Sequence, residues 1–140
     1  MPEDFLKKVD FKQLQQLNLS DNQISDIKVL EKVSFKQLQQ LNLYHNHISD
    51  IKVLEKVDFK ELQKLNLNNF LSDIKALEKV NFKELKELDL SNNKISDIKV
   101  LEKVNFKELQ KLDLRYNKID NKTNSNIIEY LKSKISKFNY

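Results

Sequence analysis

The chain has 140 residues, enough for one domain, and its formal net charge is +4 with acidic and basic residues interspersed. It contains no glycine and no cysteine, which excludes glycine-rich phosphate loops, nucleophile elbows, disulfides and thiolate metal sites. No apolar run approaches the ~18–20 residues of a membrane span, and the N-terminus lacks the apolar region of a signal peptide. We therefore expect a cytoplasmic chain that is not an enzyme, has no cofactor, binds no metal and does not enter a membrane.

The N-terminal segment is expected to be a partial repeat. Residues 5–11, FLKKVDF, match VLEKVSF at 29–35, so the chain starts midway through a unit. Residues 1–13 are therefore predicted to form an N-terminal cap, because a terminal repeat otherwise exposes its apolar flank.

Residues 14–120 contain five copies of one unit. The string DIKVLEKV occurs at 26–33, 50–57 and 97–104, and DIKALEKV occurs at 73–80. The leucines that open successive units are 24, 24, 23 and 24 residues apart. A fixed period of this length indicates a solenoid, in which each unit buries its apolar face against its neighbours.

The sequence of each unit predicts a short strand, a turn and a helical segment, the return limb, that leads back to the next strand. In LQQLNLSDN, at 14–22, alternation places the leucines inward and residues such as Asn18 outward. The asparagine that ends this motif turns the chain, and it is one of the few residues besides glycine that tolerate a left-handed backbone. The return limb ISDIKVLEKVxF has apolar residues every three positions, which favours a 3₁₀ or short α turn capped by Ser25 or Asp26. Its phenylalanines are predicted to stack in a column: Phe35, Phe59, Phe82 and Phe106.

The last segment, 121–140, is predicted to be a capping helix. Ile127, Leu131, Ile135 and Phe138 recur at helical spacing, which gives the helix one apolar face. Such a helix would cover the flank of the last repeat. A helix that docks a partner or lies on a membrane surface is the alternative.

With these motifs in place, the sequence resembles the leucine-rich repeat family. The resemblance lies in LxxLxLxxNxI followed by SDI, covers residues 6–120, and is strongest to internalin-like, short intracellular members through NQISDI and NKISDI. It implies an α/β fold, a right-handed horseshoe solenoid with a parallel sheet of five short strands on the concave face, 3₁₀ or α turns on the convex side and a C-terminal capping helix. It also implies binding of other proteins through the concave strands and their adjoining loops.

The five units differ mainly at outward strand positions, whereas the convex segments are nearly identical. We therefore expect the variable positions to bind a protein partner, with the largest contributions from Tyr44, His45, Arg115 and Tyr116, because tyrosine and arginine often anchor interfaces. Sequence drift at solvated positions after a recent duplication is the alternative. The full predicted surface consists of Gln16, Asn18, Gln40, Asn42, Tyr44, His45, Lys64, Asn66, Asn68, Phe70, Glu87, Asp89, Lys111, Asp113, Arg115 and Tyr116.

The third unit is one residue short, between Leu67 and Asn69. The deletion places Phe70 at a position where the other units carry a polar residue. Phe70 is expected either to fold against the neighbouring repeats or to form an exposed apolar dent within the binding surface.

Three further patterns have structural explanations. His45 and His47 lack the additional ligands that a metal site needs. The aspartates of SDI recur with identical neighbours, which is typical of helix caps rather than of catalysis or calcium binding. The lysines of the return limb are interleaved with glutamates, so we expect no nucleic acid partner.

The function predicted from the sequence is that of a small, monomeric binding module. No nucleophile and base occur in a catalytic pattern, and the variable positions point to a protein partner. A structural or scaffold fragment of a larger receptor or effector is the alternative.

Overall fold

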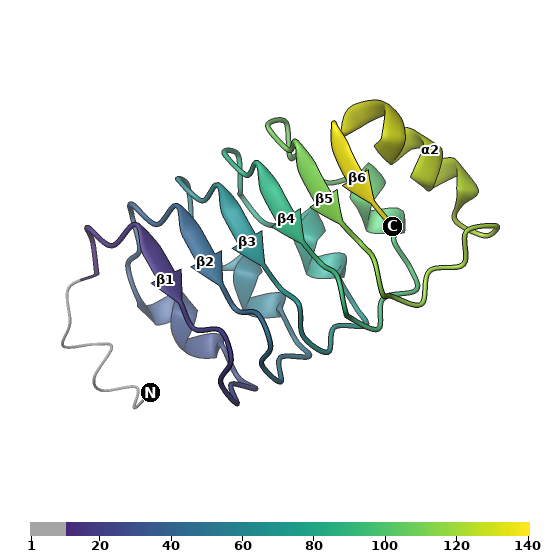
Figure 1. The fold of residues 1–140 in the computed structure, drawn as a ribbon. Coiled ribbons are helices and arrows are strands. Elements are labelled where there is room, and N and C mark those ends of the chain that lie inside the picture. Colours follow the sequence, from purple (N-terminus) through teal and green to yellow (C-terminus); the bar gives the residue numbers. More distant parts are fainter. Residues whose placement is uncertain (1–10) are drawn as a thin grey trace.

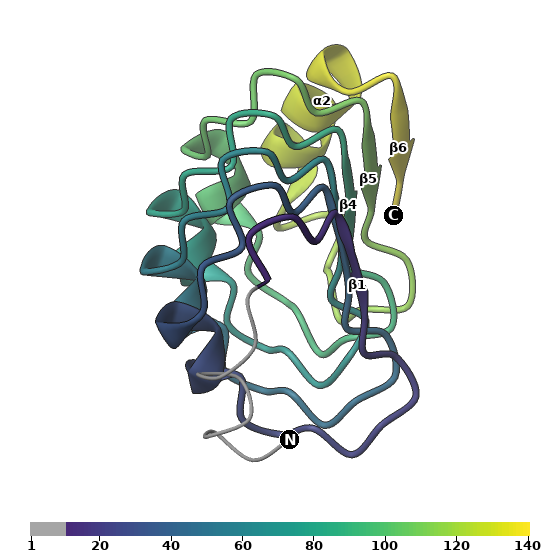
Figure 2. The same ribbon diagram turned by 90° about the vertical axis from the view of Figure 1, so that its left-hand side faces the viewer.

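The computed structural model describes residues 11–140, which form a solenoid one repeat wide (Figure 1). The described strands are short and parallel, and each one pairs with the next along the chain. Seen from the end of the row of repeats, the chain has two layers, the sheet on one side and helical turns on the other (Figure 2). The strands are β1 (Gln16–Asn18), β2 (Gln40–Asn42), β3 (Lys64–Asn66), β4 (Glu87–Asp89), β5 (Lys111–Asp113) and β6 (Lys137–Asn139). The other layer contains the 3₁₀ turns η1 (Lys28–Lys32), η2 (Lys52–Glu55), η3 (Lys75–Glu78) and η4 (Lys99–Glu102), followed by the helix α2 (Ser125–Lys134).

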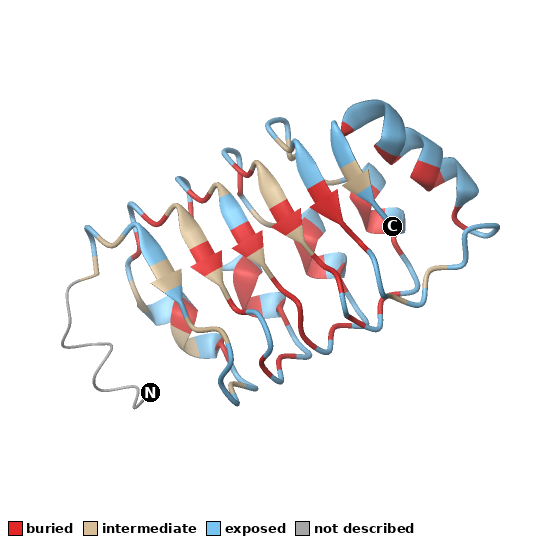
Figure 3. Cartoon of the chain, viewed as in Figure 1, coloured by how far each residue is buried: buried red, intermediate tan, exposed pale blue. Residues whose placement is uncertain are grey.

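The leucines of the repeats form the core between the two layers. The register places equivalent residues side by side, so Leu65 lies between Leu41 and Leu88. These side chains are at most 2% exposed, and they belong to the buried stripe across the strands in Figure 3. Burial of one such leucine stabilises the fold by about 2 kcal/mol. The predicted inward orientation of the leucines is therefore confirmed.

A ladder of buried asparagine side chains joins the repeats at the turn after each strand. Asn93 is 8% exposed, and its Nδ2 donates to the carbonyl oxygens of Leu67 and Leu90 at 2.9 Å. Its Oδ1 accepts from the backbone N–H groups of Asn69 and Leu71 at 3.0 and 2.9 Å. One side chain thus satisfies backbone groups of its own repeat and of the preceding one. Similar bonds are made by Asn46, Asn69 and Asn117.

The left-handed backbone of the turns lies one residue before these asparagines. The non-glycine residues with positive φ in the described chain are Asp21, His45, Asn92 and Tyr116, with values of 56°, 54°, 54° and 59°. The asparagines of the ladder are therefore needed for their side-chain amides and not for a left-handed backbone.

The third repeat lacks the left-handed position. The backbone N–H of Asn68 donates to Oδ1 of Asn66, as the N–H of Tyr44 does to Oδ1 of Asn42. Asn68 therefore corresponds to Tyr44, and the residue missing before Asn69 is the one with positive φ. The deletion removes a strained residue and leaves the asparagine ladder intact.

The aspartates of SDI cap the 3₁₀ turns, as predicted. In each case Oδ1 accepts from the backbone N–H two residues later, at 2.8 to 3.0 Å. These bonds satisfy N–H groups that the short turns leave without a partner. The capping residues are Asp26, Asp50, Asp73 and Asp97.

Phenylalanine rings contact one another from repeat to repeat beside the leucine core, in tilted, edge-to-face and stacked pairs. The ring centroids of Phe11 and Phe35 are 5.6 Å apart, those of Phe35 and Phe59 5.9 Å, and those of Phe59 and Phe82 6.1 Å. Phe106 packs against the same core but is half-buried. The predicted column is thus present from Phe35 to Phe82, whereas Phe106 is in none of these ring pairs.

The C-terminal segment differs from the predicted helix over 121–140. The helix α2 covers only residues 125–134 and packs beside η4, in the row of helical turns (Figure 1). After α2 the chain returns to the sheet, where Phe138 lies opposite Leu112. The sheet of the described chain therefore has six strands rather than five.

The physical reason is the open edge of β5. Its backbone groups need hydrogen-bond partners, and β6 supplies them: the N–H of Leu114 donates to the carbonyl oxygen of Asn139 at 2.7 Å. Ile135, Phe138 and Tyr140 repeat the LxxLxL spacing, a signal that the helical spacing of the first two obscured. Of the predicted N-terminal cap, residues 1–10 lie outside the described residues.

Candidate functional site

The outward side chains of β2 to β5 line a shallow hollow of ≈ 380 Å³ on the open face of the sheet, here called the concave face. Gln16 and Asn18 continue this face on β1, where both are exposed. The hollow brings together nine of the residues predicted to bind a partner: Gln40, Asn42, Lys64, Asn66, Glu87, Asp89, Lys111, Asp113 and Arg115.

A row of three charges crosses the hollow. A carboxylate oxygen of Glu87 on β4 lies 3.3 Å from Nζ of Lys64 on β3, and the other lies 3.9 Å from Nζ of Lys111 on β5. The three side chains are 40% to 51% exposed, so these ion pairs contribute little to stability. Because the equivalent residues of β1 and β2 are Gln16 and Gln40, the face is neutral at one end and charged from β3 onward.

The residues at the centre of the concave face have a second role within their own repeats. The side-chain Oδ1 of each accepts from the backbone N–H two residues later, at 2.9 to 3.0 Å. Asparagine and aspartate make this bond more strongly than serine or threonine, which accounts for their use at this position in all five repeats. The set consists of Asn18, Asn42, Asn66, Asp89 and Asp113.

Asp113 and Arg115 form a tightly bound ion pair at the charged end. Nε of Arg115 donates to both carboxylate oxygens of Asp113 at 3.0 and 3.1 Å, and Nη2 donates to one of them. Burial raises the pKa of Asp113, but the hydrogen bonds from Arg115 and the charges of Arg115 and Lys111 outweigh it, so this pKa lies below the ordinary value of 3.8. The hydrogen bond and charge of Asp113 raise the pKa of Arg115. Arg115 is thereby oriented while 52% of its side chain stays exposed.

The other residues expected to contribute most lie on the turns beside the hollow. Tyr44 is 40% and Tyr116 73% exposed. Nδ1 of His45 lies 2.9 Å from Oδ1 of Asp21, and the His45 ring centroid lies 5.7 Å from that of Tyr44. Together with Arg115, the residues Tyr44, His45 and Tyr116 form what we call the turn rim of the concave face.

Phe70 is exposed and also contacts both neighbouring repeats. It is 45% exposed, its ring centroid lies 5.7 Å from that of His47, and Nζ of Lys94 lies 5.2 Å from the ring centroid. Its backbone N–H donates to the carbonyl oxygen of Ile48, which holds Phe70 between the equivalent residues of the two neighbouring repeats, His47 and Lys94. Phe70 thus contacts the neighbouring repeats, as in the first expectation, while its ring stays partly exposed. A dent within the binding surface stays a prediction.

Some predicted surface residues are less available than expected, and others were missed. Asn68 is only 9% and Asp113 only 6% exposed, because neighbouring turns and the Arg115 side chain cover them. Lys137 and Asn139 on β6 extend the concave face, opposite Lys111 and Asp113. The LxxLxL spacing around Phe138 is the sequence signal that could have found them.

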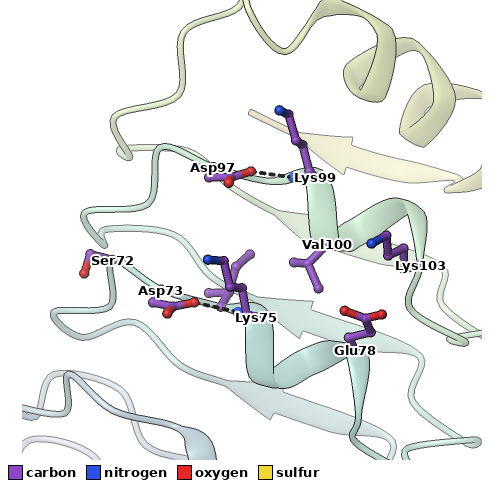
Figure 4. Close-up of a pocket in the computed structure, with 9 residues that line it drawn as sticks. Ser72, Asp73, Lys75, Glu78, Asp97, Lys99, Val100 and Lys103 are labelled. Carbon is purple, nitrogen blue, oxygen red and sulfur yellow. Dashed lines mark hydrogen bonds between the residues drawn. The ribbon is translucent and has the colours of Figure 1, made fainter.

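The convex side contains the repeated caps. Figure 4 shows the groove between η3 and η4, where Asp73 and Asp97 accept from the backbone N–H groups of Lys75 and Lys99. Over residues 11–140, no group of three or more histidine, cysteine, aspartate or glutamate side chains is arranged to hold a metal ion. None of the helices in that range is long and apolar enough to cross a membrane.

The family comparison agrees with this architecture. A family model described as "Leucine Rich repeats (2 copies)" matches this chain three times, at residues 12–56, 36–79 and 83–127. These matches cover most of the sequence, and the chain belongs to the leucine-rich repeat family. Such proteins are generally protein-interaction modules and are typically non-catalytic. No functionally curated protein matches the sequence.

Several solved structures are similar and include internalins. Internalin C2 from Listeria monocytogenes is 29% identical with a TM-score of 0.67, and the match covers 91% of this chain and 51% of that one. The internalin inlF from the same species is 27% identical with a TM-score of 0.68, covering 91% and 41%. A leucine-rich repeat protein of Leptospira interrogans is 28% identical with a TM-score of 0.68, covering 100% and 40%. The chain is therefore internalin-like, and it spans about half or less of the length of these proteins.

Proposed function

We propose that this chain is a non-catalytic module that binds a protein partner with its concave face and turn rim. The observation that carries the proposal is the contrast between the two sides of the solenoid. The convex segments are nearly identical, whereas the concave residues change from glutamine at Gln16 and Gln40 to the charged row around Glu87. The fold constrains the inward residues and the turn residues, and it leaves the exposed outward residues free to differ. A surface that is specific for one partner requires such differences.

The chemistry of this surface favours a protein over a polyanion. The charged row contains both signs, and the exposed Tyr44, Arg115 and Tyr116 are of the residue types that anchor protein interfaces. The convex lysines are interleaved with acids, as in the pair of Lys56 and Glu31 at 3.9 Å. A mixed surface of this kind gives charge complementarity with a partner of defined shape.

The test is affinity purification from the native source with the wild-type chain and with a triple variant. Tyr44→Ala, Arg115→Ala and Tyr116→Ala together should remove the partner that the wild type retains. With that partner purified, Tyr44→Ala or Tyr116→Ala alone should weaken binding by over ~1 kcal/mol, about fivefold in Kd, in a calorimetric titration.

A convex variant is the matched control. Lys75→Ala with Lys99→Ala changes two exposed residues on the opposite side and should leave the affinity unchanged. Circular dichroism shows whether each variant is folded. If the folded triple variant binds as tightly as the wild type, the concave proposal is wrong, and a role as a scaffold fragment of a larger protein becomes the better explanation.

We also infer a monomeric state and a cytoplasmic location. The location is supported by a sequence without cysteine, since disulfides are common in oxidising compartments. Sedimentation equilibrium tests the first inference, and fractionation of the native source tests the second. A stable dimer or an exported protein would contradict them.

A further inference from the structure

Asp89 and Asp113 occupy equivalent positions on neighbouring strands, but only Asp113 is bound by a cation. The two residues lie side by side in the register of β4 and β5, and Oδ1 of each accepts from the backbone N–H two residues later, at 2.9 and 3.0 Å. Nε and Nη2 of Arg115 also donate to the carboxylate of Asp113. In the fourth repeat, Ser91 stands at the position of this arginine.

The carboxylate of Asp89 has neutral partners in the part of the chain that the structure describes. Its Oδ1 accepts from the N–H and the hydroxyl of Ser91 at 2.9 and 2.6 Å, and its Oδ2 accepts from Nδ2 of Asn66 at 3.3 Å. None of the ion pairs formed within residues 11–140 includes Asp89. Hydrogen bonds therefore orient this carboxylate, while no cationic side chain is in contact with its charge.

The space that the Arg115 side chain occupies over Asp113 is open over Asp89. Asp113 is only 6% exposed, in part because Arg115 lies on it, whereas Asp89 is half-buried and lines the hollow of the concave face. The side chain of Ser91 is short and is itself buried. The fifth repeat thus shows how an aspartate at this position holds a guanidinium, and the fourth repeat presents the same carboxylate without one.

The other charged side chains of the hollow are paired with one another. Glu87 lies 3.3 Å from Nζ of Lys64 and 3.9 Å from Nζ of Lys111, and the remaining acid and base are the aspartate and arginine of β5 described above. An anion that enters the hollow would therefore compete with an existing ion pair at each basic side chain that lines it. A cation would meet an available carboxylate at Asp89, so charge complementarity favours a cation.

We propose that Asp89 binds an arginine side chain of the protein partner, in the way that Asp113 binds Arg115. The proposal rests on the binding function proposed for the concave face, and it names the chemistry of the partner at the centre of that face. A guanidinium presents parallel N–H donors that match the two oxygens of a carboxylate, and such charge-assisted bonds are about twice as strong as neutral ones. Because Asp89 is already oriented by hydrogen bonds, little side-chain entropy is lost on binding.

An arginine tripeptide tests the site independently of the native partner. Acetyl-Gly-Arg-Gly-amide is titrated into the isotopically labelled full chain, and the backbone N–H resonance of Ser91 reports binding at Asp89 by NMR spectroscopy. We expect a saturable shift with this peptide. Binding should be at least about tenfold weaker with citrulline in place of arginine, because citrulline has a similar shape but no charge. A lysine peptide should also bind more weakly, because an ammonium group cannot form two parallel bonds with the carboxylate.

Three variants locate the binding at this carboxylate. Asp89→Asn keeps the acceptor for the N–H of Ser91 and should weaken peptide binding at least about tenfold. Ser91→Arg copies the fifth repeat into the fourth and should abolish binding, because the introduced guanidinium occupies Asp89. Arg115→Ser copies the fourth repeat into the fifth and should add a second peptide site at Asp113, reported by the backbone N–H at position 115.

The matched control removes one negative charge from the convex side. Glu78 is exposed on η3, so Glu78→Gln should leave the peptide affinity within about twofold of wild type. The absence of a saturable shift, equal affinity for the arginine peptide and either the citrulline or the lysine peptide, or an equal loss with Glu78→Gln would overturn the proposal.

The native partner distinguishes this proposal from the function on which it rests. With the purified partner, Asp89→Asn should raise Kd at least about tenfold in a calorimetric titration. A partner that is lost by the triple variant of the turn rim but kept by Asp89→Asn would overturn the arginine site alone and leave the proposed function in place. A partner that both folded variants retain would overturn the two proposals together.

Discussion

Two neighbouring positions in each turn show how this chain separates scaffold from surface. The ladder position is asparagine in all five repeats, and Asn46, Asn69 and Asn93 are buried. The position before it is present in four of the five repeats and holds a different residue in each of them. This residue is exposed, and the fold requires of it only a left-handed backbone. The third repeat lacks this second position altogether. A side chain that bonds backbone groups of two repeats thus cannot vary, whereas its neighbour varies in type and is even dispensable.

The largest expected effect is at the ladder. Asn93→Ala removes bonds to the N–H groups of Asn69 and Leu71 and to the carbonyl oxygens of Leu67 and Leu90. Because these buried groups are left without partners, we expect the free energy of unfolding to fall by about 3 kcal/mol in urea denaturation.

The matched control is Asn22, the exposed first residue at the ladder position. Within residues 11–140, Nδ2 of Asn22 bonds only carbonyl oxygens of its own repeat, those of Leu19 and Ser20. Asn22→Ala should therefore cost less than about 1 kcal/mol. Equal losses of unfolding free energy in the two variants would show that the bonds between repeats are not the reason why the ladder position is always asparagine.

An intermediate effect is expected at Asp113, where an outward residue is also part of the turn. Its pKa is lowered from 3.8, so the ionised carboxylate stabilises the folded chain above the pKa of the unfolded state, and this stability is lost as the pH falls through the folded pKa. Asp113→Asn keeps the acceptor for the N–H of Arg115 but removes the charge. We expect a loss of about 1–2 kcal/mol at neutral pH that disappears in acid, measured by urea denaturation as a function of pH.

Asp89→Asn is the control for this pair. Asp89 is the equivalent residue of β4, and Ser91 stands where the fifth repeat has Arg115. Its loss at neutral pH should be smaller, because no arginine holds its carboxylate within its own repeat. If both variants change the acid unfolding curve equally, the pairing with Arg115 is not the source of the stabilisation.

The smallest expected effect has the opposite sign. Tyr116 has a φ of 59°, a conformation that is unfavourable for a bulky residue and better tolerated by asparagine. Tyr116→Asn should raise the free energy of unfolding by about 0.5–1 kcal/mol, measured by urea denaturation. The reciprocal variant Asn92→Tyr should lower it by a similar amount, and changes of the same sign in both variants would contradict this explanation.

Features that recur in every unit were predictable from the sequence. The inward leucines, the caps such as Asp73, the column through Phe59 and the outward position of Lys64 all follow from a pattern repeated about every 24 residues. Features that occur once were not predictable in this way. The pairing of β6 with β5, the half-buried state of Phe106 and the burial of Asp113 each depend on a contact between segments that have no counterpart in the other repeats.

The sequence by itself determined the period, the family, the inward and outward faces and the residue types available for binding. Each of these is a property of one unit, and copying the unit places equivalent residues side by side. Only the tertiary structure decided that the residue before Asn93 takes the left-handed backbone, that residues 137–139 form a strand and that Phe106 stays half-buried. These outcomes depend on which backbone groups and rings remain without partners after the repeats have stacked, and the repeat pattern does not contain that information.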